Sequence, residues 1–317
     1  MDVSIIIVNW NSAAFLRQCL ASIYRNTAGI DFEVIVVENA SFDGSREIVD
    51  NEFPHAAFIQ SHNNLGFAKA NNLGVAQARG TRLLFLNPDT EVLGDAVSQM
   101  AGVFVQRPDS GAVGCKLLNT DGSLQTSCLL PFPTILNQAL SAEALLCVAS
   151  KIGVWGIKPL FVDMKGIWPV QAISGACLMV NRDTFYTVGG FSSDYFMYTE
   201  DIDLCYKIWK AGFINYYANT AEVLHHGGGS SNRRKESSFA DIQMSESVYK
   251  FLRKTRGSLY ANGYRLAMTF VALARIGLIS VFFMLSLGMS RSLPLRYSFT
   301  KWISILRWSL MLEKWAR

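Results

Sequence analysis

The stretch VSIIIVNWNS, residues 3–12, decides the fold class. It starts with an apolar, β-branched run at Val3–Val8, which is typical of a strand that is buried on both faces of a sheet. Ser12 stands where it can cap a helix. The apolar positions after it follow helical spacing: Phe15, Leu16, Cys19, Leu20 and Ile23. A buried strand, a polar turn and an amphipathic helix therefore predict the first unit of an α/β fold.

The same alternation continues along the chain. Further buried strands are predicted at Val34–Val37, Ala57–Gln60, Leu83–Leu86, Ala112–Leu118, Ala172–Val180 and Ile214–Leu224. Helices are predicted at Asp43–Phe53, Phe67–Ala78 and Ala96–Val105, and from a capping Thr199 to Ala211. Strands that alternate with helices favour a parallel sheet with helices on both faces.

The composition of the 317 residues excludes several classes of protein. Hydrophobic residues make up 50% and charged residues 17%, so a sizeable core is possible and disorder is disfavoured. A formal net charge of +4, without a long run of Lys or Arg, gives no support for nucleic-acid binding. The apolar run at residues 3–8 is too short for a signal peptide, and Asp2 replaces the basic residues that would precede it.

Six cysteines stand at positions 19, 115, 128, 147, 177 and 205, and none belongs to a CxxC pair. This spacing indicates neither a zinc knuckle nor a redox motif. Most of the cysteines lie in apolar runs, so we expect buried, reduced thiols of a cytosolic protein.

Polar side chains cluster where the predicted strands end. They form three groups: Asn9 with Asn11, then Glu38, Asn39, Ser41 and Asp43, then Asn87 with Asp89. In sheets of this kind, ligands bind beyond the carboxyl ends of the strands. Isolated polar turn residues are usually only turns, but three clusters at one sheet edge favour a binding site.

A divalent metal site is predicted from Asp89 and His225. Hard cations prefer carboxylate oxygen and often share it with substrate phosphates, and imidazole suits Mn²⁺ more than Mg²⁺. The Gly-rich run after His225 provides a loop able to close over a diphosphate, whereas His55 and His62 are expected to be structural. Because the sequence has no GxxxxGK[ST] and no GxGxxG after a strand, ATP hydrolysis and dinucleotide binding are disfavoured.

Glu200, Asp201 and Asp203 crowd the start of one predicted helix. Acids in a first helical turn often do no more than compensate the helix dipole. The same acids could supply a general base for an acceptor hydroxyl. The residue types alone leave both interpretations open.

Residues 120–170 lose the alternation of strands and helices. Prolines and tryptophans stand there among apolar residues: Pro131, Pro133, Trp155, Pro159, Trp168 and Pro169. An irregular packed connection and an acceptor-binding region with an apolar lining fit this composition equally well.

The C-terminal region has the composition of a membrane-associated tail. Leu266–Met289 is apolar and long enough to cross a bilayer, which takes about 20 residues. Arg275 near its middle costs roughly 2.5–3.5 kcal/mol there, so an interfacial or re-entrant helix competes with a true span. Lys301–Arg317 combines aromatic and basic residues, which suits a membrane surface, although a helix packed on the globular domain would have the same pattern.

Seven segments of the chain resemble family 2 glycosyltransferases, particularly their rhamnosyltransferase-like branch. The segments are VSIIIVNWNS at 3–12, VVENASFDGS at 36–45, NNLGFAKANNLGVAQARG at 63–80, LLFLNPDT at 83–90, SGACLMVNRDTFYTVGGF at 174–191, FMYTEDIDLC at 196–205 and HHGGGSS at 225–231. They run in consistent order from residue 3 to residue 231, which is far more specific than any single motif.

The resemblance implies a GT-A fold, a Rossmann-like mixed sheet flanked by helices, and inversion at the anomeric carbon of a nucleotide-sugar. Asp201 in the TED segment matches the family's catalytic base. Asp89 matches the metal-binding acid of the DxD-type motif, and His225 matches the histidine before the Gly-Gly-x-Ser-Ser loop. Glu38, Asn39 and Asp43 match the nucleoside-binding turn.

The remaining contacts that we expect follow the same segments. Further donor contacts are expected from Asn9, Asn11, Ser41, Gly66, Phe67, Asn71 and Asn87, with Asp89. Acceptor contacts are expected from Gly175 and Glu200.

Two positions depart from the family pattern. The DxD-type motif reads Asn87-Pro88-Asp89, so one carboxylate is lost and metal binding relies more on His225. The usual aspartate of the nucleoside-binding turn is Glu38, whose longer side chain could still accept a hydrogen bond from a base imide.

Taken with the tail, the resemblance predicts a metal-dependent, inverting hexosyltransferase of cell-surface polysaccharide biosynthesis. It would work at the cytoplasmic face of the inner or plasma membrane, with a catalytic domain at 1–258 and a helical membrane-associated region at 259–317. The implied donor is dTDP-rhamnose and the implied acceptor is a lipid-linked saccharide or a growing polysaccharide. Mn²⁺ or Mg²⁺ is the expected cofactor, and Asp201, expected to have a low pKa, is the expected base.

Two alternatives belong to other classes. One is a nucleotide-sugar-binding protein that has lost catalysis, and turnover of a donor would exclude it. The other is a membrane scaffold whose globular part only binds partners, which predicts no metal-dependent binding of a nucleoside diphosphate.

Overall fold

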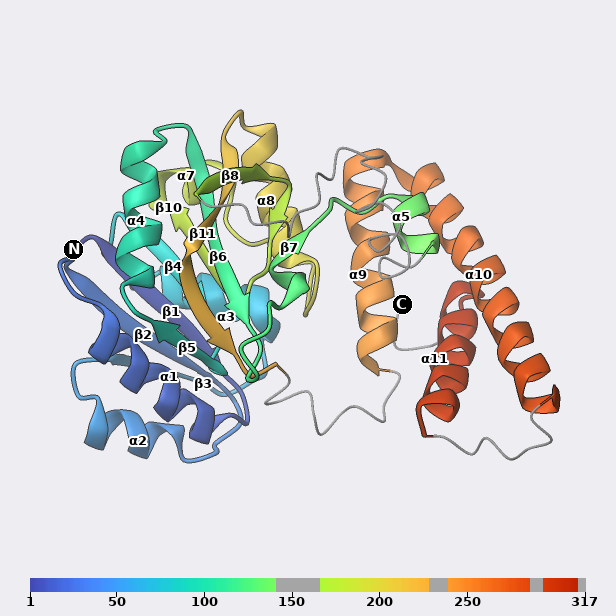
Figure 1. Cartoon of the computed structure of the whole chain (residues 1–317), viewed down its shortest axis with the longest axis horizontal. Coiled ribbons are helices and arrows are strands. Elements are labelled where there is room, and N and C mark those ends of the chain that lie inside the picture. Colours follow the sequence, from blue (N-terminus) through green and yellow to red (C-terminus); the bar gives the residue numbers. More distant parts are fainter. Residues whose placement is uncertain (141–165, 228–238, 286–292, 313–317) are drawn as a thin grey trace. The chain divides into compact units, whose positions relative to one another are not determined.

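The computed structural model describes residues 1–140, 166–227, 239–285 and 293–312 (Figure 1). Contacts divide the chain into two compact units. The first comprises Met1–Phe132 and Leu160–Asn232, and the second comprises Pro133–Pro159 and Arg233–Arg317.

Some residues that the sequence analysis names lie outside the described ranges. Trp155, Pro159, Cys147, residues 286–289 of the predicted apolar span and residues 228–231 of the glycine run lie outside the described residues. The predicted domain boundary after residue 258 falls in the first turn of a helix, Ser258–Leu285, that this division places in the same unit as the helix before it.

The first unit is built on a mixed sheet. Its strands are β1 Val3–Asn9, β2 Phe32–Asn39, β3 Ala57–Ser61, β4 Arg82–Leu86, β5 Thr90–Leu93, β6 Ser110–Leu118, β8 Ile167–Val170, β10 Cys177–Asn181 and β11 Ile214–His225. Neighbouring strands pair in the order β3-β2-β1-β4-β10-β6-β11-β5, and β8 also pairs with β11. A separate two-stranded sheet pairs β7 Leu129–Leu130 with β9 Ala172–Ile173.

The strand directions set where the loops with the predicted site residues lie. β3, β2, β1 and β4 run parallel, so their carboxyl ends lie at one edge of the sheet. β10 runs antiparallel to β4 and β6, and β11 runs parallel to β6 but antiparallel to β5 and β8. The predicted mixed α/β class is therefore confirmed, whereas the simpler expectation of a parallel sheet is wrong.

Helices cover both faces of this sheet (Figure 1). They are α1 Ala13–Asn26, α2 Ser45–Glu52, α3 Gly66–Val75, α4 Ala96–Gln106, α7 Arg182–Thr187 and α8 Glu200–Lys210, with a 3₁₀ turn η1 at Thr126–Cys128. Because parallel crossovers are right-handed, the order β3-β2-β1-β4 puts α1 and α2 on one face and α3 on the other.

The core of the first unit follows from the apolar runs. All seven residues of β1 are buried, as the run at Val3–Val8 predicts. Side chains of α1, β2, β4 and β6 close around it in one continuous hydrophobic cluster. The five described cysteines are free and buried in this unit, which agrees with the expectation of buried thiols.

The side chains of Ser12 and Thr199 do not cap the helices that follow them, although the sequence predicts that they do. α1 and α8 begin directly after Ser12 and Thr199, but neither hydroxyl makes a capping hydrogen bond. The Ser12 hydroxyl donates to the Trp10 carbonyl at 3.1 Å. The amide of Ala13 donates instead to the Asp43 carboxylate at 2.8 Å, so an acid from the next loop satisfies the start of α1.

The predicted strand Ala172–Val180 is broken in two. β9 ends at Ile173 and β10 begins at Cys177, so residues 174–176 leave the strand. This break frees the backbone of Gly175 and Ala176 for contacts outside the sheet.

The second unit is helical. It contains α5 Ile135–Ala139, α9 Phe239–Arg256, α10 Ser258–Leu285 and α11 Leu293–Ser309. A partly buried ion pair links α9 to α10, since Glu246 accepts from Arg265 at 3.2 Å, and Glu246 also accepts from the Trp308 indole at 2.8 Å. Arg275, which would be costly inside a bilayer, lies over the ring of Trp302 at 4.8 Å from its centroid.

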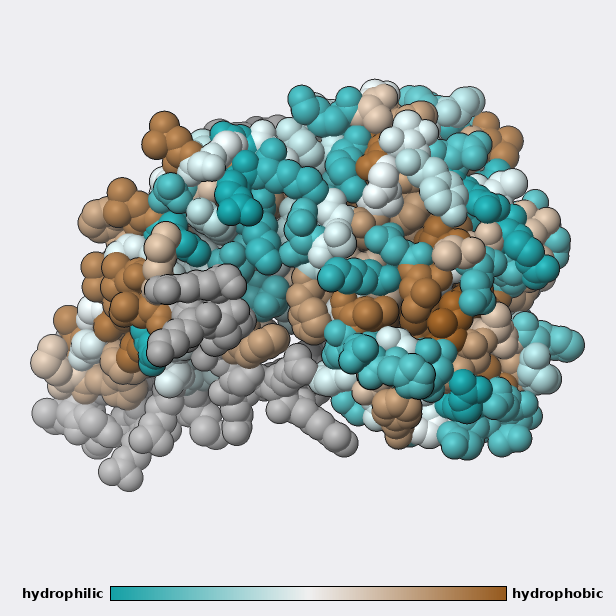
Figure 2. Space-filling model, turned by 180° about the vertical axis from the view of Figure 1, so that it is seen from behind, coloured by the Kyte–Doolittle hydropathy of each residue, from teal (hydrophilic) through white to brown (hydrophobic). Residues whose placement is uncertain are grey.

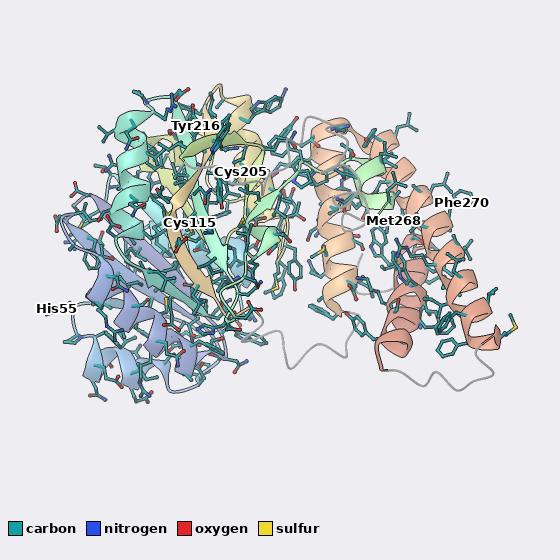
Figure 3. The ribbon with its side chains drawn as sticks, viewed as in Figure 1. His55, Cys115, Cys205, Tyr216, Met268 and Phe270 are labelled. Carbon is teal, nitrogen blue, oxygen red and sulfur yellow. The ribbon has the colours of Figure 1, made fainter. Side chains whose placement is uncertain are left out.

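One side of α10 is packed and the other is exposed. Ala261, Tyr264, Met268 and Ala272 are buried in the unit. Figure 3 shows Met268 and Phe270 on different sides of the helix, and Phe270 is 63% exposed. Figure 2 shows hydrophobic side chains gathered over this unit, at the left of the view. Among the described residues, the segment Ser258–Met284 is long and apolar enough to cross a membrane.

The substitution Gly80→Ala tests how tightly the turn before β4 packs against the backbone of β1. A Cβ at this position would lie 2.4 Å from the amide nitrogen of Ser4, a backbone atom that cannot move away. We expect Gly80→Ala to lower the free energy of unfolding by about 1–3 kcal/mol in urea titrations. Gly102→Ala on α4 meets no atom closer than 3.9 Å and is the control, expected to be neutral or slightly stabilising. Equal effects of the two substitutions would contradict this packing.

Candidate functional site

The ends of β1 and β2 are joined by a buried hydrogen-bond network. Register pairs Asn9 with Glu38, and the Asn9 amide donates to the Glu38 carboxylate at 2.6 Å. The other Glu38 oxygen accepts from the amide and the hydroxyl of Ser41, and Ser45 donates to Glu38 at 2.6 Å. These contacts all hold the turn after β2, so a role of Glu38 in binding a nucleobase stays a prediction.

Asp43 connects this turn to the start of α1. Its carboxylate accepts from Ala13, Ser45 and Asn9. Desolvation raises the pKa of Asp43, but the hydrogen bonds from Ser45, Asn9 and Ala13 together outweigh it, so the pKa lies below its ordinary value. The carboxylate is therefore ionised at neutral pH and complements the positive end of the helix.

The loops at this edge hold strained backbone. Asn11, Ala40 and Phe42 adopt φ of 52°, 65° and 51°, a region that residues with a Cβ rarely occupy. Phe42 is also 67% exposed although it is a large aromatic side chain. Strain of this kind concentrates at ligand-binding loops, because the surrounding structure must hold it.

Asn39 ties the end of β2 to the turn before α3. Its side-chain oxygen accepts from the Leu65 amide at 2.8 Å, and its nitrogen donates to Asn64 at 3.0 Å. In this turn Gly66 has φ of +74°, and a Cβ there would lie 2.1 Å from the carbonyl oxygen of Phe196. Only glycine fits this close approach of the Phe196 backbone, so position 66 requires glycine for the packing of the turn. The donor contact predicted for Gly66 stays a prediction.

Asn71 lies one turn further along α3. It is buried, and its amide donates to the Phe67 carbonyl inside the same helix. The donor contact predicted for Asn71 stays a prediction.

Asp201 stands at the start of α8 against the broken strand. Its two carboxylate oxygens accept from the amides of Gly175 and Ile202, each at 2.8 Å. Desolvation raises the pKa of Asp201 above its ordinary value, and the bonds from these two amides only partly offset it. The expected low pKa of Asp201 is therefore wrong, because it took no account of burial.

The neighbouring Glu200 is more deeply buried. It is 6% exposed, and its Oε2 atom has no hydrogen-bond partner among the described residues. Burial, and then the charge of Asp201, raise the pKa of Glu200 well above its ordinary value. Tyr198 and Thr199, directly before it, have φ of 68° and 69°, so the approach to this acid pair is strained.

Asp203 has a structural role, unlike the two acids before it. Ser192 donates to one of its oxygens at 2.5 Å, and Tyr195 donates to the other at 3.2 Å. Asp203 thereby fixes the loop that follows α7. A general-base role of Glu200 or Asp201 stays a prediction.

A second pair of predicted residues meets where β5 pairs with β11. The register sets His225 opposite Thr90, and Nε2 of His225 lies 3.4 Å from Oδ1 of Asp89. The side-chain nitrogen of Asn87 is 3.5 Å from the same Nε2 atom. A carboxylate oxygen and an imidazole nitrogen at this spacing suit a divalent cation that is completed by substrate oxygens. Within the described ranges, no three His, Cys, Asp or Glu side chains form a metal cluster alone.

Residues 174–176 bring the two halves of the site together. The Gly175 amide binds Asp201, and the carbonyl of Ala176 accepts from the Asn87 amide at 3.0 Å. The ring of Phe67 also approaches Gly175, since a Cβ there would lie 3.4 Å from it. Asp201, Asn87 and Phe67 of α3 therefore all lie against one short segment.

Sequence reasoning missed several residues that organise this site. The side-chain oxygen of Gln125 lies 2.6 Å from Nδ1 of His225 and can only accept from it, and Asn72 exchanges two hydrogen bonds with the backbone of Phe191. His226 points instead to Glu91 at 2.7 Å. These partners lie at least 100 residues apart in the chain, so no local pattern signals them.

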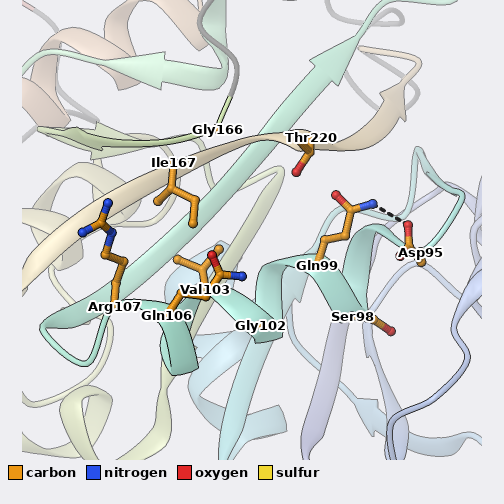
Figure 4. A pocket seen from close by; sticks show the side chains of 10 residues that line it. All are labelled: Asp95, Ser98, Gln99, Gly102, Val103, Gln106, Arg107, Gly166, Ile167 and Thr220. Carbon is orange, nitrogen blue, oxygen red and sulfur yellow. Dashed lines mark hydrogen bonds between the residues drawn. The ribbon is translucent and has the colours of Figure 1, made fainter.

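A separate hollow lies along α4. It encloses about 460 Å³ and is lined by residues of α4 together with Gly166, Ile167 and Thr220 (Figure 4). None of the predicted site residues lines it. It has no buried charged group, and we assign it no role.

Comparisons with known proteins agree with the resemblance in the sequence. A family model described as Glycosyl transferase family 2 matches residues 4–135. This range includes the ends of β1, β2 and β4 and stops before Asp201 and His225.

Two relatives extend the likeness beyond that range. The N-acetylglucosaminyl-diphospho-decaprenol L-rhamnosyltransferase of Mycobacterium tuberculosis is 28% identical over 240 residues, which are 70% of this chain and 75% of that protein. Rhamnosyltransferase WbbL of Escherichia coli K12 is 24% identical over 234 residues, which are 71% of this chain and 83% of that protein.

A solved structure has the same fold. It is that of mannosyltransferase PcManGT from Pyrobaculum calidifontis in complex with GDP-Man and Mn²⁺. The match has a TM-score of 0.61 at 17% identity and covers 99% of this chain and 87% of that one. At this identity the likeness concerns the fold alone, and it confirms the predicted GT-A class.

The burial of Glu200 predicts a pH-dependent cost to stability. Because its folded pKa lies above the ordinary 4.5, the folded state keeps a proton that the unfolded state loses. Stability contributed by this group is present below pH 4.5 and is lost as the pH rises towards the folded pKa. We expect Glu200→Gln to be more stable than wild type at neutral pH, with the difference disappearing in acid. Urea titrations over a pH series measure it, with the exposed Glu47→Gln as control. Parallel curves for wild type and Glu200→Gln would count against a buried, protonated acid.

Proposed function

We propose that this chain, a rhamnosyltransferase-like protein of glycosyl transferase family 2 with a GT-A fold, transfers a hexosyl group with inversion from a nucleotide-sugar to a lipid-linked or polysaccharide acceptor. The observation that supports this most is that residues 174–176 contact both Asp201 and Asn87, two positions before the Asp89 that lies 3.4 Å from His225. A general base and a cation-binding pair at one sheet edge are the two functions that the reaction needs.

The proposed cation site consists of Asp89 and His225. Both side chains are mostly buried, with 11% and 15% of their surface exposed, and they are close enough to ligate one ion together. Mn²⁺ or Mg²⁺ bound there would supply positive charge to a departing nucleoside diphosphate. Asn87 adds an amide beside the pair, in place of the second carboxylate of a DxD-type motif.

Asp201 is the proposed general base. The acceptor oxygen forms a bond to the anomeric carbon as the bond from that carbon to the diphosphate oxygen breaks, and the acceptor proton passes to the Asp201 carboxylate. A base is most effective when its pKa is near the working pH, and burial moves the pKa of Asp201 in that direction. The Gly175 amide holds one carboxylate oxygen, so the direction of the base is fixed before the acceptor arrives.

The donor is proposed to enter at the strained loops after β1 and β2. Asn9, Ser41 and Asp43 hold these loops rather than project from them. Asn11 and the 67% exposed Phe42 remain accessible there. The donor is proposed to be dTDP-rhamnose, because two relatives are rhamnosyltransferases by name. The proposed role of Glu200 in binding the sugar acceptor rests on its Oε2 atom, which has no hydrogen-bond partner among the described residues and can donate a hydrogen bond when protonated.

Asp201→Asn tests the proposed base. The amide keeps the shape of the side chain but cannot take the acceptor proton, so kcat should fall by about 10²–10⁴-fold while the Kd for the donor changes little. Turnover is measured as nucleoside diphosphate released, and donor affinity by calorimetry. Asp183→Asn, an exposed acid at the start of α7, is the control and should keep full turnover. Equal loss of donor binding and turnover in Asp201→Asn would contradict the role of base and favour a binding protein without catalysis.

The second unit is proposed to hold the site near its acceptor at the cytoplasmic face of the membrane. One side of α10 presents large apolar side chains that no described element covers: Leu266, Phe270, Leu273, Leu278, Val281 and Phe282 are all between 48% and 71% exposed. The same unit carries exposed basic side chains at Arg253, Lys254 and Arg256, in the last turn of α9 directly before α10 in the chain. A helical unit that combines an exposed apolar face with basic residues is suited to anionic lipid.

The double substitution Phe270→Glu with Leu278→Glu tests this membrane contact. Each removes an apolar group whose burial stabilises by about 1.5–3 kcal/mol, so most of the protein should move from the pellet to the supernatant when it is sedimented with anionic vesicles. Val105→Glu, at an exposed apolar residue of α4, is the control and should still sediment. Persistent sedimentation of the double variant would contradict the proposed contact.

A further inference from the structure

We infer that Gln125 is a positioning residue: its side-chain oxygen holds the His225 imidazole in the tautomer that leaves Nε2 free to ligate the cation beside Asp89. The inference rests on the proposed function, since it assigns a role in the same cation site. Gln125 lies within residues 4–135, which the family model matches, but in none of the seven motif segments quoted above, and it stands 100 residues before His225.

The backbone of Gln125 is itself fixed. Its amide donates to the Leu117 carbonyl at the end of β6, at 2.8 Å. Its carbonyl accepts from Cys128 at 3.1 Å, which closes the 3₁₀ turn η1. The side chain therefore projects towards His225 from a rigid position and not from a freely moving loop.

A directional chain of hydrogen bonds sets which end of the Gln125 amide faces His225. The chain begins at Asp121, whose carboxylate accepts from the Ser123 hydroxyl at 2.6 Å. Ser123 in turn accepts from the Asn119 side-chain nitrogen at 2.9 Å, and the Asn119 oxygen accepts from the Gln125 nitrogen at 3.1 Å. The Gln125 oxygen is left to face Nδ1 of His225 at 2.6 Å.

The direction of each hydrogen bond from Asp121 to Gln125 is fixed by the hydrogen bond before it. An ionised carboxylate can only accept, and hydrogen bonds from Ser123 lower the pKa of Asp121, so the carboxylate stays ionised at neutral pH. The hydroxyl of Ser123 must then use its proton towards Asp121, and each amide that follows has one possible orientation. The direction of the whole chain is thus set by Asp121, at its far end.

The orientation of the Gln125 amide determines the tautomer of His225. A carbonyl oxygen accepts only, so Nδ1 must carry the ring proton. Nε2 of the neutral ring is then an acceptor, and it faces Oδ1 of Asp89, another acceptor, at 3.4 Å. Two atoms with facing lone pairs repel each other unless a cation lies between them. Gln125 thereby favours cation binding, since a partner that holds the proton of a histidine on one nitrogen orients the other as a ligand.

The test compares two substitutions of Gln125 that differ in one property. Gln125→Met keeps the length of the side chain and loses the carbonyl acceptor, whereas Gln125→Glu keeps an acceptor for Nδ1. The readout is Mn²⁺ affinity with dTDP present and no sugar, measured by the loss of the free Mn²⁺ signal in electron paramagnetic resonance. Gln106→Met, an exposed glutamine of α4, is the control for the change of residue type.

We expect Gln125→Met to weaken Mn²⁺ binding by about 10–100-fold, and Gln125→Glu and Gln106→Met to bind nearly as wild type does. Mn²⁺ binding by Gln125→Met at wild-type affinity, with loss in His225→Ala, would overturn the role of Gln125 and leave the proposed cation site in place. Wild-type affinity in His225→Ala and Asp89→Asn as well would show that the proposed cation site itself is wrong. Equal weakening in Gln125→Met and Gln125→Glu would overturn the role of the acceptor oxygen.

A measurement on the unsubstituted protein keeps the inference testable if Gln125→Met fails to fold. Long-range ¹H–¹⁵N correlation spectra of the metal-free full chain distinguish the two neutral tautomers of each histidine. We expect His225 to carry its proton on Nδ1. A proton on Nε2 would overturn the inference, because Nε2 would then be a donor and not a ligand.

Discussion

The antiparallel pairing of β5 with β11 is the contact on which the candidate site depends. It sets His225 opposite Thr90 and so places an imidazole beside Asp89, although 136 positions separate the two residues in the chain (225 minus 89). Successive side chains of a strand point to opposite faces, so a slip of one residue would replace His225 with His226 at this place. The observed register instead directs His226 to Glu91, which keeps the two histidines in different surroundings.

Burial then gives the acids of the site different chemistry. Asp43, half-buried and held by three donors, has a lowered pKa, whereas Asp201 and Glu200 have raised ones because desolvation outweighs the hydrogen bonds they receive. Asp203, three residues after Glu200, is occupied by Ser192 and Tyr195 and fixes a loop. A carboxylate therefore holds a helix start, has a raised pKa or fixes a loop, and its surroundings decide which.

The sequence predicts the parts of this structure that local patterns control. Short apolar runs located the strands of the first unit, and the polar residues predicted at their ends lie at one edge of the sheet, because the parallel neighbours end together. It missed what depends on distant partners. The break at residues 174–176, the cap of α1 by Asp43 and the contact of Gln125 with His225 all join segments that are far apart in the chain. The raised pKa of Asp201 was also out of reach, because it arises from burial that only the folded chain creates.

The most direct test of the account is a crystal structure of the full chain with Mn²⁺ and dTDP, with anomalous scattering used to locate the metal. We expect an anomalous peak for manganese that contacts both the Asp89 carboxylate and Nε2 of His225. We expect the diphosphate to contact the same metal and the nucleoside to bind at the loops after β1 and β2. A nucleotide bound elsewhere, for example in the hollow along α4, or a metal that touches neither side chain, would contradict the account.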